Sequence, residues 1–168
     1  MFAHRVSRGF TLVELLIVVV VLGILAGIVL PSFNSSTEDS KVSAVTQNLS
    51  VLRSAVDLYK AQHSDNYPGY GSGGTPDATT FTNQLTMASK KDGTTSAVGT
   101  TGYALGPYLK TGIPANPFNG KTTITMVADN AAIPAADDTT GWFYKAKTGE
   151  VKCNSTFVTA DSVAVYSY

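Results

Sequence analysis

One uncharged stretch near the N-terminus, interrupted by a single carboxylate, constrains this chain more than any other feature. Between Phe10 and Phe33 the only charged residue is Glu14, and the residues from Phe10 to Leu30 are mostly Val, Ile and Leu. As an α-helix this run would extend roughly 31 Å, the thickness of a bilayer's hydrocarbon core. We therefore predict that residues 10–30 form a helix that spans a membrane.

The residues before this run carry positive charge. Arg5 and Arg8 lie there without any acidic residue, and basic residues on one side of a span favour the cytoplasmic side. No Ala-x-Ala cleavage site follows the run, as it would after a conventional signal peptide. We expect a single-pass protein whose N-terminus is cytoplasmic and whose later residues are translocated.

Glu14 needs a partner inside a membrane, where an acidic group costs on the order of 2.5–3.5 kcal/mol. A cut after Gly9 would give Phe10 a new α-amino group, and an ammonium is a suitable partner for a carboxylate. Phe10 and Glu14 stand four residues apart on one helix, and the Glu14 of a neighbouring chain could serve equally well. An ordinary anchor has no reason to carry this carboxylate, so Glu14 is a candidate functional residue.

The segment from Gly9 to Val18 reads Gly-Phe-Thr-Leu-Val-Glu-Leu-Leu-Ile-Val. It resembles the type III signal sequence of the type IV pilin superfamily, which includes pilins and the pseudopilins of type II secretion. The resemblance implies that a prepilin peptidase cuts between Gly9 and Phe10 and that the Phe10 amine is N-methylated. It also implies that Glu14 supports subunit registration during assembly, and that Pro31 allows local unwinding in the filament.

The next segment has a helical pattern. An apolar stripe with spacings of three and four residues predicts an amphipathic helix through about Gln62. Whether one helix continues through Pro31, or a second helix starts at the capping-box spacing of Ser35 and Glu38, stays open. Taken without a break, residues 10–62 would form a spine of roughly 80 Å. The stripe consists of Val42, Val45, Leu49, Leu52, Val56 and Tyr59.

The remaining residues predict a small domain that covers the stripe. Asp77 can cap a short helix with Phe81, Leu85 and Ala88 on its inner face. Alternating residues at 121–127 and a hairpin around Gly149 predict about three antiparallel strands. We expect an α+β fold, a long helical spine packed against a small antiparallel β-sheet. Its segments are a cleaved leader (1–9), a transmembrane and assembly helix (10–30), the amphipathic half of the spine (31–62), and a periplasmic loop and sheet domain (63–168).

Motifs in this second half extend the resemblance. Tyr67-Pro68, Ile113-Pro114, Asn116-Pro117 and the Gly141-Trp142-x-Tyr144 hairpin are similar to segments of major pseudopilins. Major pseudopilins also commonly bind calcium in a C-terminal loop. Oxygen ligands suit calcium, so the resemblance implies a possible calcium site at Asp129, Asp137 and Asp138.

Composition excludes several other functions. The twelve Lys and Arg equal the twelve Asp and Glu, and no basic cluster beyond the leader could follow a phosphate backbone, so no nucleic acid is expected. Cys153 is the only cysteine; it excludes an internal disulfide and is expected to be a small buried hydrophobe. His63, the only histidine after the leader, is expected to be solvated in a polar turn, and no nucleophile motif supports catalysis. We therefore predict that the chain is not an enzyme.

These features together predict a structural subunit of a type IV pilus-like filament. A pseudopilin of type II secretion is the first choice, and a pilin for adhesion, motility or DNA uptake is the alternative. A membrane-anchored periplasmic binding or enzymatic domain is an alternative of another class. The resemblance implies homo-polymerisation, other pilin-like subunits, prepilin peptidase and an inner-membrane assembly platform as partners. It implies the bacterial inner membrane, with the C-terminal domain periplasmic, and then an extracytoplasmic filament as locations.

Overall fold

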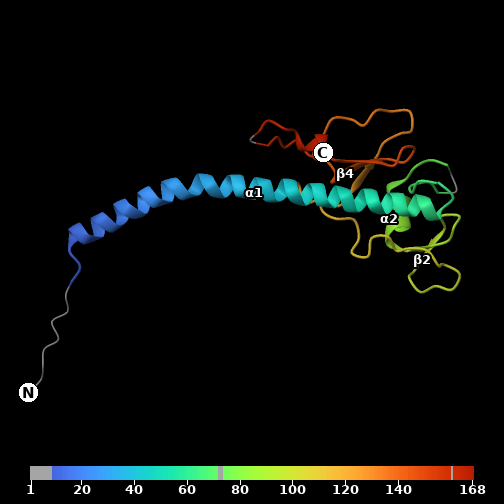
Figure 1. The fold of residues 1–168 in the computed structure, drawn as a ribbon, viewed down its shortest axis with the longest axis horizontal. Helices are drawn as coiled ribbons and strands as arrows, with labels where there is room; N and C mark the ends of the chain where they lie inside the picture. The colour runs from blue at the N-terminus through green and yellow to red at the C-terminus, as the bar shows by residue number, and fades with distance from the viewer. Residues whose placement is uncertain (1–8, 72–73, 160) are drawn as a thin grey trace, which may run out of the picture. The chain divides into compact units, whose positions relative to one another are not determined.

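The computed structural model describes residues 9–71, 74–159 and 161–168, without the side chains of residues 27–36. The chain divides into two compact units between Asp39 and Ser40, and each is described by itself. The long helix α1, Leu12–Gln62, contributes residues to both units (Figure 1).

The backbone of α1 is helical throughout its 51 residues. The helix therefore continues through Pro31, and Ser35 does not begin a second helix. It ends after Gln62 because Ser64 and Asp65 adopt left-handed backbone angles, with φ of 56° and 64°. The Asp65 amide donates to the Lys60 carbonyl at 3.1 Å, which satisfies one of the acceptors that a helix end leaves unpaired.

The predicted apolar stripe on the second half of α1 forms one side of the hydrophobic core. Five of its members are at most 2% exposed, and Val42 is half-buried. Apolar residues three and four apart share one face of a helix, so burial of this face fixes the helix against the sheet and α2. The buried members are Val45, Leu49, Leu52, Val56 and Tyr59.

The larger sheet has three strands in the order β3-β4-β5. Strand β4 pairs antiparallel with β5, as the hairpin pattern predicted, but β3 pairs parallel with β4. The expectation of a purely antiparallel sheet is therefore wrong, and the sheet is mixed. The connection 127–141 is long enough to return the chain to the start of a parallel neighbour, which a tight turn cannot do. The strands are β3 Ile124–Met126, β4 Trp142–Lys145 and β5 Glu150–Cys153.

A smaller layer lies beside the end of α1 (Figure 1). Helix α2, Ala78–Thr86, begins at the predicted cap, where Asp77 Oδ2 accepts from the Thr80 amide at 2.7 Å. Its inner residues Phe81 and Leu85 are fully buried. It leads into the two-stranded antiparallel sheet of β1, Ala88–Ser89, and β2, Thr95–Ser96. A short 3₁₀ helix, Val165–Ser167, follows near the C-terminal end.

Two aromatic residues of β4 attach proline-containing segments to the sheet. The Trp142 indole donates to the Pro114 carbonyl at 2.9 Å, and the Tyr144 hydroxyl donates to the Pro68 carbonyl at 2.9 Å. Both side chains are fully buried, so these hydrogen bonds satisfy their polar atoms inside the core. The Tyr-Pro and Ile-Pro motifs thus have a structural role at β4.

Candidate functional site

The start of α1 is held by three reciprocal hydrogen bonds between Thr11 and Glu14. The Glu14 carboxylate accepts from the Thr11 amide and from the Thr11 hydroxyl, both at 2.9 Å, and the Glu14 amide donates to the Thr11 hydroxyl at 3.2 Å. This is the capping-box arrangement, in which an N-cap Thr and a Glu three residues later satisfy each other's backbone amides. The Glu14 carboxylate therefore lies at the amide of Thr11, the residue that follows Phe10.

The cost of a charge in an apolar run does not reveal this partner of Glu14. The signal for it is the spacing Thr11-x-x-Glu14 before an apolar run, the same capping-box spacing as at Ser35 and Glu38. A second partner, the Phe10 amine, exists only after a cut at Gly9, so that pairing stays a prediction. Residues 1–8 of the predicted leader lie outside the described residues.

The apolar residues at the start of α1 are not covered by any other described residue. Phe10 is 84% exposed and Leu12 is 83% exposed, and every large hydrophobic residue from Phe10 to Leu25 is about half-exposed or more. A Cβ at Gly9 or at Gly23 would meet nothing within 4 Å. Such a continuous apolar surface marks a contact with other protein or with lipid.

Among the residues that the structure describes, no helix is both long enough and apolar enough to cross a membrane. The predicted span includes residues 27–30, whose side chains are not described, and the span stays a prediction. Pro31, predicted to act in assembly, also has no described side chain.

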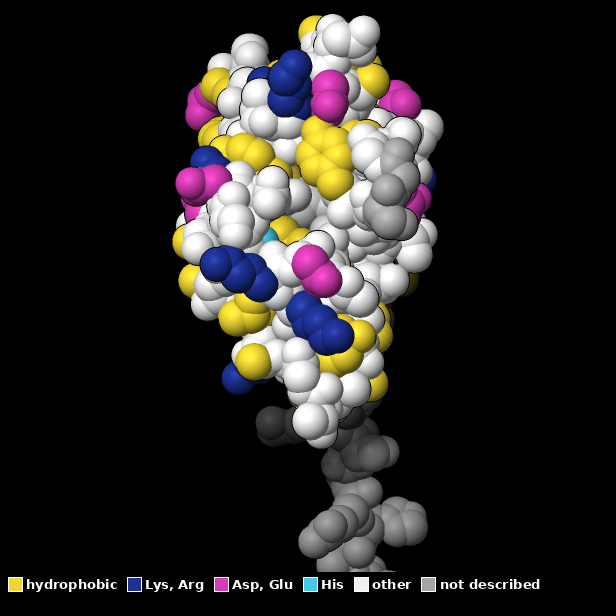
Figure 2. Space-filling view, turned by 90° about the vertical axis from the view of Figure 1, so that its right-hand side faces the viewer, with side chains coloured by type: hydrophobic (Ala, Val, Ile, Leu, Met, Phe, Trp, Pro, Cys, Tyr) yellow, Lys and Arg dark blue, Asp and Glu magenta, His cyan; other side chains and the backbone are white. Residues whose placement is uncertain are grey.

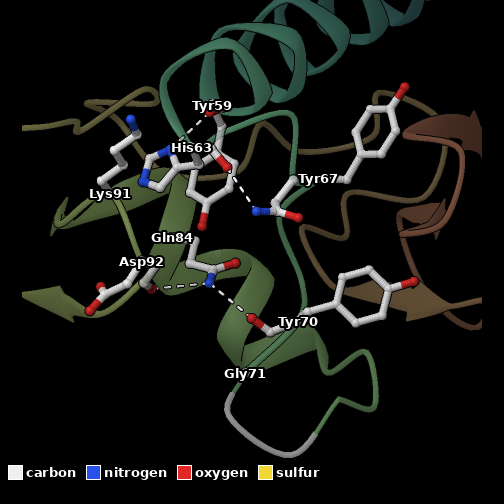
Figure 3. Close-up of a pocket in the computed structure, with 10 residues that line it drawn as sticks. Tyr59, His63, Tyr67, Tyr70, Gly71, Gln84, Lys91 and Asp92 are labelled. Carbon is white, nitrogen blue, oxygen red and sulfur yellow. Dashed lines mark hydrogen bonds between the residues drawn. The ribbon is translucent and has the colours of Figure 1, made fainter.

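His63 lies at the floor of a polar pocket with a volume of about 230 Å³ near the end of α1 (Figures 2 and 3). The expectation that this histidine is solvated is wrong, because it is 1% exposed. Its ring stacks on Tyr59 at 3.7 Å between centroids. Its Nδ1 donates to the Tyr59 carbonyl, 2.8 Å away, since a carbonyl can only accept.

The other ring nitrogen of His63 lies 3.1 Å from the Ser89 hydroxyl, as in a nucleophile and base pair. Ser89 is fully buried, however, and the third partner is a backbone carbonyl where a catalytic triad has a carboxylate. The Ser89 hydroxyl is not exposed to solvent. The pair therefore serves to fix the end of α1 against β1.

Cys153 is fully buried, which confirms the expectation of a small hydrophobe. Burial raises the pKa of its thiol to about 11, and Asn116 donates to its sulfur at 3.2 Å. A protonated and inaccessible thiol is a poor nucleophile and a poor metal ligand.

The three acidic residues of the connection 127–141 do not form one cluster. The Asp129 carboxylate accepts a hydrogen bond from the Tyr70 hydroxyl at 2.7 Å. The Asp137 carboxylate instead accepts from Asn154, and the Asp138 carboxylate accepts from Thr156. Within the described part of the chain, no group of three His, Cys, Asp or Glu residues could hold a metal ion. Calcium binding stays a prediction.

Three asparagines hold the end of this connection in place. Asn154, fully buried, accepts from the Asp137 and Asp138 amides through Oδ1 and donates to the Asp137 carboxylate through Nδ2. Asn116 donates to the Gly141 carbonyl at 2.9 Å, and Asn119 donates to the Thr140 carbonyl at 2.9 Å. The Asn-Pro-Phe-Asn-Gly motif is therefore the support of the connection as it enters β4.

Gly141 is required where this support meets β4. A Cβ at this position would lie 2.1 Å from the Lys121 carbonyl oxygen, a backbone atom that cannot move alone. We expect Gly141→Ala to lower the free energy of unfolding by about 1–3 kcal/mol or more, the usual cost of forced overpacking. Denaturant unfolding followed by Trp142 fluorescence measures this loss.

Gly71→Ala is the matched control, because its Cβ would make only an ordinary contact of 3.6 Å with Thr80. Equal stability of the Gly141→Ala variant and this control would show that the close approach of Lys121 to Gly141 is not a constraint.

Two aspartates of the connection 127–141 make the stability of the fold depend on pH. Hydrogen bonds from the Thr139 amide and from Asn154 lower the pKa of Asp137, and a bond from the Thr156 hydroxyl lowers the pKa of Asp138. A depressed folded-state pKa contributes stability that is complete above the ordinary value of 3.8 and is lost as the pH falls through the lower folded value. We expect the melting temperature to fall below about pH 4.

Asp137→Asn should flatten this fall, and the exposed Asp161→Asn serves as its control. Thermal unfolding between pH 7 and pH 2.5 measures both. Identical profiles for the two variants would contradict the assignment to Asp137.

Comparisons with known proteins find a family motif near the N-terminus. The prokaryotic N-terminal methylation motif matches residues 4–30. The chain is similar to type II secretion system core protein G of Klebsiella pneumoniae, 41% identical over 62 residues, which are 37% of this chain and 44% of that protein. The core protein G of Pseudomonas aeruginosa is 41% identical over 57 residues, 34% of this chain and 40% of that protein.

A fimbrial protein of Pseudomonas aeruginosa matches more of the chain with lower identity. It is 28% identical over 120 residues, which are 63% of this chain and 75% of that protein. No solved structure matches. The chain thus spans less than half the length of these two secretion proteins. The chain is therefore similar to proteins of two kinds, secretion core proteins and a fimbrial protein, and carries the methylation motif at residues 4–30.

Proposed function

We propose that this chain is a structural subunit of a type IV pilus-like filament, a pseudopilin of a type II secretion system. The observation that carries the proposal is the start of α1, where a capped Glu14 is the only charge on an exposed apolar helix surface. A helix of this kind needs lipid before assembly and other copies of itself afterwards. Its relatives named as secretion core proteins support the choice of machine.

In this proposal the chain is first held in the bacterial inner membrane by residues 10–30. Prepilin peptidase removes residues 1–9, and the amine of Phe10 is methylated. An inner-membrane assembly platform then moves the subunit into the filament, where α1 packs against the α1 of neighbouring subunits. The second unit, from Ser40, lies in the periplasm and carries the sheet.

The fimbrial relative favours a second candidate, a pilin used in adhesion, motility or DNA uptake. This match covers the larger share of the chain. Deletion of the gene for this chain distinguishes the two: loss of protein export with intact surface fibres supports the pseudopilin, and loss of surface fibres with intact export supports the pilin.

A membrane-anchored binding or enzymatic domain is the candidate of another class. It predicts that the chain stays in the membrane fraction as single subunits. The proposal predicts that cells producing this chain with its peptidase and platform release it by shearing, as polymers that sediment at high speed. Absence of any sedimenting polymer under these conditions would reject both filament candidates together.

A further inference from the structure

A lysine side chain lies at the turn where the connection 127–141 enters β4. Lys121 Nζ donates to the Asp138 carbonyl at 2.7 Å and to the Thr139 carbonyl at 3.0 Å. Asp138 has a left-handed backbone with φ of 56°, a conformation that aspartate tolerates. Two consecutive carbonyls thus converge on one positive charge.

The position of Lys121 is fixed by its own backbone. Its amide donates to Asn119 Oδ1 at 3.0 Å, and its carbonyl accepts from the Asn116 amide at 2.9 Å. The Lys121 carbonyl also packs against Gly141, as the close approach at that glycine shows. The turn 116–121, which contains the buried Asn116, therefore holds the Lys121 backbone beside the connection 127–141.

The acidic groups of the same turn already have protein donors. Asp137 Oδ1 accepts from the Thr139 amide at 3.0 Å, the Thr139 hydroxyl at 2.7 Å and Asn154 Nδ2 at 2.7 Å. Asp138 Oδ2 accepts from the amide and the hydroxyl of Thr156. Calcium needs six to eight oxygen ligands at 2.3–2.6 Å, and these oxygens face N–H and O–H groups instead. In this arrangement the carboxylate oxygens do not form a set of ligands that fits calcium.

We propose that the Lys121 ammonium takes the place of a divalent cation in this turn, so that residues 137–141 are ordered without metal. An ammonium supplies positive charge to backbone carbonyls through charge-assisted hydrogen bonds at 2.7–3.0 Å. Lys121 is a positioning residue for the entry of β4. This inference concerns the second unit alone and is independent of the filament proposal.

Amide hydrogen exchange of the full chain in detergent tests the proposal. In the unaltered chain, exchange of peptides covering 137–141 should be the same in EDTA and in millimolar calcium chloride. Lys121→Met should speed exchange in these peptides roughly tenfold or more, since a hydrogen bond to a charged group is lost. The exposed Lys147→Met is the matched control and should leave the exchange unchanged.

Either of two results would overturn the proposal. One is slower exchange or a higher melting temperature of the unaltered chain when calcium alone is added, which would show a metal site. The other is a Lys121→Met variant that exchanges at the rate of the control. The comparison of EDTA with calcium uses the unaltered chain. It therefore tests for a metal site even if the Lys121→Met variant does not fold.

Discussion

Replacing Glu14 with valine is expected to abolish incorporation into filaments while membrane insertion continues. Valine removes the only charge between Phe10 and Phe33, which favours insertion, but it also removes the partner that we propose for the Phe10 amine. Loss of one partner of a buried ion pair shifts an equilibrium by roughly a hundredfold or more. Immunoblots of the sheared and membrane fractions measure the two populations.

Glu14→Gln separates charge pairing from helix capping. Glutamine can accept from the Thr11 amide as glutamate does, since both residues serve in capping boxes. We expect Glu14→Gln to assemble as poorly as Glu14→Val, because neither carries the negative charge. Leu16→Val is the control for apolar change in the same segment. Full assembly of Glu14→Gln would contradict a charge-based role and would assign Glu14 to capping alone.

Gly9→Val is expected to leave the chain as an uncleaved precursor that never enters filaments. Among the described residues, a side chain at Gly9 would meet nothing within 4 Å, so the substitution adds no clash there. We therefore expect its effect to arise where the proposed peptidase binds the residue before the cut. Mobility of the membrane-bound chain on denaturing gels reports the cleavage.

Gly23→Ala is the control for Gly9→Val. Gly23 is equally free of neighbours but lies away from the cut, so this variant should be processed like the unaltered chain. Normal cleavage of the Gly9→Val variant would contradict the assignment of the cleavage site to the bond between Gly9 and Phe10.

The helical parts of the fold were predictable from sequence because their signals are local. The stripe from Val45 to Tyr59 and the Asp77 cap depend on residues within a few positions of one another, and both were confirmed. The direction of β3 was not predictable, because pairing with β4 depends on the path of the intervening connection. Alternation along a strand indicates which face is buried, not which way its neighbour runs.

The contacts of the candidate site were less predictable than its residues. Glu14 could be recognised from the cost of a charge in an apolar run, whereas its bond to Thr11 depends on the separate capping spacing Thr11-x-x-Glu14. His63 is buried in contact with Ser89 and Tyr108, both of which are distant from it in sequence. Lys121 carried no signal, since a lysine in a polar turn is normally solvated and its two carbonyl partners come from another segment.

Intact-mass measurement of the mature chain, taken from the membranes of cells that process it, tests the filament account most directly. The account predicts a chain that lacks residues 1–9 and begins at Phe10 with one added methyl group. An N-terminus at any other residue, or an unmodified chain that still begins at Met1, would contradict it.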